Sequence, residues 1–123
     1  MIKKLLFIAS LLISIGGYSQ QFTSDYRAYV KVKTTKKGKS KLKVKEILRD
    51  RDDLCLSNTL LIINSQTNIF IDLELQKETT DSKLFEGNDD GTLCSVTLFK
   101  HTDPLTLFIN YGEWGVIYFL NKK

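Results

Sequence analysis

The chain has 123 residues, 42% of them hydrophobic, with a formal net charge of +4. This length suits one domain with a modest core rather than several domains. Two of the lysines lie in an N-terminal segment that we expect to be removed, which leaves a net charge of +2. The remaining charge is too small to indicate a nucleic-acid-binding protein.

The N-terminus has the layout of a secretory signal peptide. Two lysines precede an apolar run of eleven residues from Leu5 to Ile15, and small residues precede a cleavage position before Gln20. As a helix this run is about 16 Å long, which is half of the ~30 Å hydrocarbon core of a membrane. We therefore predict a signal-peptide helix over residues 1–19, one mature domain over residues 20–123, and a secreted or periplasmic location.

The first predicted strands form a hairpin. Polar and apolar residues alternate strictly over residues 26–33, a turn around Gly38 follows, and the alternation resumes over residues 41–45. The register that groups the apolar side chains pairs Val32 with Leu42 and Val30 with Val44. It turns these apolar residues inward and a ladder of lysines outward. The ladder consists of Lys31, Lys33, Lys41, Lys43 and Lys45.

The rest of the chain also has strand patterns. Short apolar or alternating runs occur at residues 59–64, 69–77 and 83–85, and three further runs separated by turns occupy residues 92–121. Asp90-Gly91 suits a tight hairpin turn, and the only candidate helical turns lie in residues 46–54. We predict an all-β fold of about eight short antiparallel strands, as a small barrel or a sandwich.

The two cysteines of the chain, Cys55 and Cys94, both lie in the mature part. An even number of cysteines in an exported protein favours a disulfide. Closing this loop would stabilise the fold by about 4 kcal/mol in the chain-entropy model. The alternative is a pair of separately buried thiols.

Charge is segregated along the chain. Residues 27–51 carry eleven Lys or Arg against two acids, whereas residues 52–100 carry nine acids against three lysines. The ladder places like charges opposite each other, which is unfavourable unless something compensates it. One interpretation is that Asp72 and Glu74 of a neighbouring strand pair with the lysines. The other is that the ladder docks on an external polyanion, such as phosphorylated lipid head groups or an acidic polysaccharide.

Aromatic residues gather near the last turn. Tyr111, Trp114 and Tyr118 form a candidate pocket wall for a small apolar ligand or a sugar ring. The alternative is ordinary packing in the core.

The sequence predicts no enzyme, no cofactor and no metal site. The single histidine, His101, lies in a turn, and neither its neighbours nor the cysteines have the spacing of a catalytic or zinc site. We predict a non-enzymatic exported β-domain that binds a partner protein or an anionic surface through the basic hairpin. A small-ligand carrier and a hydrolase with its site in the loops are the alternatives.

Overall fold

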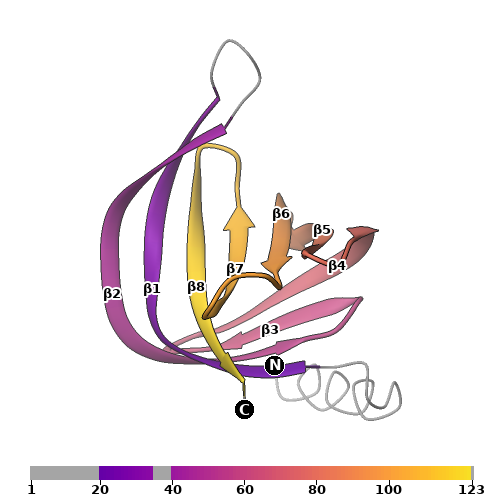
Figure 1. Cartoon of the computed structure of the whole chain (residues 1–123), viewed down its shortest axis with the longest axis horizontal. Coiled ribbons are helices and arrows are strands. Elements are labelled where there is room, and N and C mark those ends of the chain that lie inside the picture. Colours follow the sequence, from indigo (N-terminus) through magenta and orange to yellow (C-terminus); the bar gives the residue numbers. More distant parts are fainter. Residues whose placement is uncertain (1–19, 35–39, 123) are drawn as a thin grey trace.

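The computed structural model describes residues 20–34 and 40–122. The predicted signal peptide and the turn around Gly38 lie outside these residues. The described chain is a closed barrel of eight antiparallel strands, each hydrogen-bonded to its neighbours in sequence, with β1 pairing with β8 (Figure 1). The strands are β1 (Gln20–Thr34), β2 (Ser40–Leu56), β3 (Leu60–Asn64), β4 (Asn68–Glu78), β5 (Ser82–Asp89), β6 (Thr92–Phe99), β7 (Leu105–Asn110) and β8 (Trp114–Lys122).

This architecture confirms the predicted all-β fold and decides for a barrel. Each strand is joined to the next by a short connection, so the topology is up-and-down. The β5–β6 turn is the predicted tight one: Asp90 and Gly91 have φ of 50° and 93°, and the Gly91 N–H donates to Asn88 Oδ1 at 2.7 Å. Left-handed residues at both central positions match the twist of a two-residue hairpin.

Apolar side chains from all eight strands fill the barrel interior, where alternate residues point inward. They are Phe22, Leu54, Leu56, Leu61, Ile63, Ile71, Leu73, Phe85, Cys94, Val96, Leu98, Leu107, Ile109, Val116, Tyr118 and Leu120. Strand β3 is covered on both sides as predicted, because Leu60 and Ile62 on its other face are buried with Cys55 and Phe70.

The prediction of helical turns in residues 46–54 is wrong. Strand β2 continues through this segment, although Asp and Arg are poor strand formers. The tertiary context explains the difference, because Asp52 is fully buried against Arg27 of β1 while its sequence neighbours Arg51 and Asp53 point to the other face.

The β1–β2 hairpin is longer than the rest of the barrel. Strand β8 pairs with β1 only as far as Lys31, whereas β1 and β2 remain paired to Thr34 and Ser40. Strand β3 pairs with β2 only through residues 53–56, and β3 and β4 then diverge from it (Figure 1). Within the described chain, β2 is therefore paired with β1 alone over residues 40–52, and β1 is paired with β8 only as far as Lys31.

Candidate functional site

The predicted hairpin register is confirmed, but its two faces are exchanged. Val30 is opposite Val44, Val32 is opposite Leu42, Lys31 is opposite Lys43, and Lys33 is opposite Lys41. A one-residue irregularity between Val44 and Glu46 leaves Lys45 without a direct partner in β1.

The faces can be assigned from β8. Val116 and Tyr118 belong to the barrel core, and they lie opposite Tyr29 and Arg27. The face of Arg27 and Tyr29 is therefore the inner one, and by alternation it continues through Lys31 to Lys33. The sequence pattern identified which residues share a face, but that face is the outer one. Val30 and Val32 are buried on it, as expected of apolar residues, whereas Leu42 and Val44 are exposed.

The four paired lysines thus extend the inner face of the barrel beyond its core. Lys31, Lys33, Lys41 and Lys43 are all exposed, as is Lys45 at the irregularity. No ion pair joins any of these five lysines to an acid within residues 20–34 and 40–122. We call the four inner-face lysines and Lys45 the lysine ladder.

The predicted compensation of the ladder by Asp72 and Glu74 is wrong. Strand β4 pairs with β3 and β5, and these two acids lie opposite Asn88 and Glu86 of β5. They are on a different part of the barrel wall because up-and-down topology places β4 three strands from β1.

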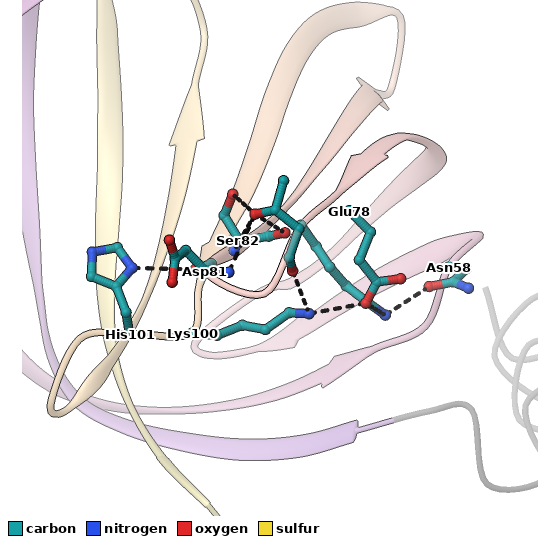
Figure 2. A network of polar contacts seen from close by, with 8 residues as sticks. Asn58, Glu78, Asp81, Ser82, Lys100 and His101 are labelled. Carbon is teal, nitrogen blue, oxygen red and sulfur yellow. Dashed lines mark hydrogen bonds and ion pairs between the residues drawn. The ribbon is translucent and has the colours of Figure 1, made fainter.

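A second group of lysines shows the contrast. Lys100 Nζ lies 2.9 Å from Glu78 Oε2, and Lys83 Nζ lies 3.8 Å from the same oxygen and 3.2 Å from Asn58 Oδ1 (Figure 2). The hydrogen bond from Lys100 and the charges of both lysines lower the pKa of Glu78. Lys83 and Lys100 thus have acidic or amide partners, whereas the lysine ladder has no ion pair in the part of the chain that the structure describes.

Aromatic residues adjoin the ladder at the end of the barrel from which the β1–β2 hairpin extends, which we call the mouth. Trp114 is opposite Lys31, and its side chain is 48% exposed. Its ring stacks on Tyr111 at a centroid distance of 4.5 Å and lies 6.4 Å from Tyr29. The Tyr111 hydroxyl donates to Asp89 Oδ2 at 2.7 Å, and burial, that hydrogen bond and the carboxylate charge together raise the pKa of Tyr111.

The structure therefore brings two predicted residue groups onto one surface. Of the three candidate pocket aromatics, Tyr111 and Trp114 lie at this mouth, whereas Tyr118 is buried in the core. Tyr29, which the sequence interpretation did not select, lies beside Trp114 as the third aromatic residue of this group. The alternation of Tyr29 with Lys31 in the sequence could have identified it.

A buried ion pair lies below the aromatic group, and the sequence interpretation missed it. Arg27 Nη1 is 2.9 Å from Asp52 Oδ2 and 3.7 Å from Asp50 Oδ2, and Arg27 Nε donates to the Tyr29 hydroxyl at 3.1 Å. Burial alone would lower the pKa of Arg27, but these hydrogen bonds and the charge of Asp52 raise it. Burial, followed by the charge of Asp52, also raises the pKa of Tyr118.

The predicted disulfide between Cys55 and Cys94 is not formed. Both residues are free thiols. Cys94 points into the barrel core opposite Gly87, where a glycine leaves room for its sulfur, whereas Cys55 packs with Leu60 on the outer face. Bonding them would require two side chains to meet through the sheet. Burial raises the pKa of both thiols, and together with the charge of Asp89 it brings Cys94 to about 11.

Candidate catalytic or metal-binding chemistry has little support in the described residues. His101 is exposed, and its Nδ1 lies 3.2 Å from the backbone oxygen of Asp81 in the network of Figure 2. Within the described part of the chain, no cluster of three or more His, Cys, Asp or Glu residues could hold a metal ion. No described helix has the length and apolar character needed to cross a membrane.

Comparisons with protein families, curated protein sequences and solved structures found no match for this chain.

Proposed function

We propose that this chain is a non-enzymatic, exported binding protein that captures an anionic partner on the lysine ladder. The observation that supports this proposal is a difference in ion pairing between two groups of lysines. Lys83 and Lys100 share a carboxylate within the fold, whereas the ladder places Lys31 opposite Lys43 and Lys33 opposite Lys41. None of the ladder lysines forms an ion pair with an acid of the described residues.

Such an arrangement has a cost that a partner can remove. Like charges directly opposite each other on a sheet destabilise it by some fraction of the ~0.2–1 kcal/mol typical of cross-strand pairs. A partner with negative charges at the same spacing would convert this repulsion into attraction. The interaction would also accelerate association, because a surface of one sign attracts the opposite charge over about one Debye length.

The aromatic group gives this face a second type of contact. Trp114 and Tyr111 present stacked rings beside Lys31, and aromatic side chains at a barrel mouth can pack against apolar or ring-shaped groups. The same observation supports a second candidate function, a small-ligand carrier that binds at the mouth. The two functions differ in their dependence on salt.

Binding of dextran sulfate tests the proposal. We expect saturable binding whose affinity falls at least about tenfold when salt rises from ~0.05 to ~0.5 M, because screening shortens the reach of exposed charges. Trp114 is the only tryptophan, so its fluorescence reports occupation of the mouth directly. Binding that ignores salt and quenches Trp114 would instead indicate the carrier, and no binding at low salt would contradict the proposal.

A matched pair of substitutions separates binding from folding. Lys43→Glu reverses one ladder charge and creates an attractive pair with Lys31, so it should weaken dextran sulfate binding without lowering stability. Lys77→Glu makes the same change at an exposed residue of β4 and should leave binding nearly intact. Equal effects of the two variants would show that only overall charge matters.

A further inference from the structure

The second strand of the hairpin has a free edge. Strand β2 pairs with β1 along its length, but on its other side it pairs with β3 only through residues 53–56. Residues 40–52 have no strand on that side within the described chain, and residues 41–47 are all exposed. An edge of this kind presents unpaired backbone N–H and C=O groups that can accept another strand.

One backbone hydrogen bond shows which residues of β2 direct their N–H and C=O groups to the free edge. The Val32 N–H donates to the Glu113 oxygen at 2.9 Å, so the backbone polar groups of Val32 point toward β8 and not toward β2. Val32 and its opposite residue Leu42 are therefore a pair without mutual hydrogen bonds. Since the pattern alternates, Lys41 and Lys43 bond to β1, whereas Leu42 and Val44 direct their N–H and C=O groups to the free edge.

The two faces beside this edge differ in chemistry. Lys41 and Lys43 are on the inner face, and Leu42, Val44 and Ile47 are on the outer face with exposures of 46%, 54% and 59%. A strand added here would place alternate side chains beside lysines and beside aliphatic groups. The best complement is a segment in which acidic and aliphatic residues alternate.

A second copy of this chain fits the edge poorly. Antiparallel pairing of two β2 edges would place the lysines of both copies together on one face, and like charges across strands are destabilising. Lysines on edge strands commonly prevent such self-association. The same lysines would not repel a strand with acidic side chains.

We propose that the free edge of β2 accepts an extended segment of a partner protein, in which acidic and aliphatic residues alternate, as an antiparallel ninth strand. This inference rests on the proposed function for its use of the lysine ladder, and it names the partner as a peptide segment. In this geometry the residues opposite Leu42 and Val44 are the aliphatic ones. Their N–H groups point toward β2, whereas the N–H groups of the acidic residues point away from it.

The test uses the full mature chain and a fluorescent peptide of about eight residues that alternates Glu with Val or Ile. We expect binding by fluorescence anisotropy. Methylating the peptide nitrogens of the aliphatic residues should weaken binding at least about tenfold, while methylating those of the glutamates should change it little. Both peptides have the same charge and composition, so the comparison isolates the backbone hydrogen bonds.

A protein variant provides the reciprocal measurement. Val44→Pro removes an N–H that points to the free edge while retaining every lysine, and proline is tolerated at such edge positions. It should weaken peptide binding at least about tenfold and leave dextran sulfate binding unchanged. If Val44→Pro misfolds, the two methylated peptides still decide the question on the unmodified protein.

The outcomes separate the two proposals. Peptide binding that both methylation patterns weaken equally, or that neither weakens, would overturn strand addition. A protein that binds dextran sulfate or vesicles containing phosphatidylglycerol but not the peptide would overturn strand addition and retain the anionic-partner function. Failure to bind any of these probes would overturn both proposals.

Discussion

The buried ion pair gives a sharp prediction about stability, because its two members are not equivalent. Asp52 is completely buried, its Oδ2 accepts from Arg27, and its Oδ1 has no hydrogen-bond partner within the described residues. Arg27 remains 13% exposed and has two further partners, Asp50 and the Tyr29 hydroxyl. Removing the arginine therefore leaves an uncompensated buried carboxylate, whereas removing the carboxylate leaves a cation that retains other contacts.

The expected magnitudes follow from this asymmetry. Arg27→Met should lower the free energy of unfolding by about 3–5 kcal/mol, the usual cost of breaking a buried pair from one side. Asp52→Asn should cost less, about 1–3 kcal/mol, because Arg27 retains Asp50 and Tyr29. The double variant Arg27→Met with Asp52→Leu removes both charges, so it should be more stable than Arg27→Met alone.

Urea denaturation of the three variants measures these free energies. Arg51→Met is the matched control, since Arg51 is 69% exposed and its change should stay within about 0.5 kcal/mol. An Arg27→Met variant as stable as this control would refute the reasoning. So would an Asp52→Asn variant that is destabilised more than Arg27→Met.

Two further predictions concern the core and its thiols. Gly115→Ala should lower the free energy of unfolding by about 1–3 kcal/mol in urea denaturation, since an added Cβ would lie 2.5 Å from Phe108 Cε1 and 2.6 Å from the Ile109 backbone oxygen; an unchanged stability would contradict this. Mass spectrometry without reductant should find two alkylated thiols after unfolding. In the native protein Cys94 should react slowly with iodoacetamide at pH 8, because a pKa of about 11 leaves roughly one molecule in a thousand as thiolate. The reaction should become faster as the pH rises toward that value. Thiols that are labelled only after reduction would show that the disulfide is formed.

Local sequence patterns were sufficient for the strands and the hairpin register. Period-two alternation makes Val30, Val32, Leu42 and Val44 share a face whatever surrounds them, so the predicted pairing agrees with the structure. Alternation does not say which face is inside. That choice depends on Val116 and Tyr118 of β8, which are 72 to 88 residues further along the chain.

The long-range features could not be predicted for the same reason. The pairing of Asp52 with Arg27, the separation of Cys55 and Cys94 on opposite faces, and the distance of Asp72 from the ladder all follow from the order of strands around the barrel. Without that order, the sequence suggests that opposite charges pair with each other and that the two cysteines form a disulfide. The sequence named the lysines, Tyr111 and Trp114 of the candidate site but not Tyr29, and it placed Tyr118 there although Tyr118 lies in the core. It did not predict that the lysines and aromatic residues share one face.

The position of the ion pair links the core to the candidate binding face. Asp53 is the β2 residue at which pairing with β3 ends, and Asp52 is the next residue toward the hairpin tip. Beyond this point β2 has β1 as its one neighbouring strand in the described chain, so the cross-strand pair of Arg27 and Asp52 joins the two strands where the third leaves them. The inner face of β1 then changes from Arg27, which is paired with Asp52, through Tyr29 to Lys31, which has no ion pair among residues 20–34 and 40–122. A single strand thus supplies both the anchor that orients the free hairpin and the first charge that a partner would meet.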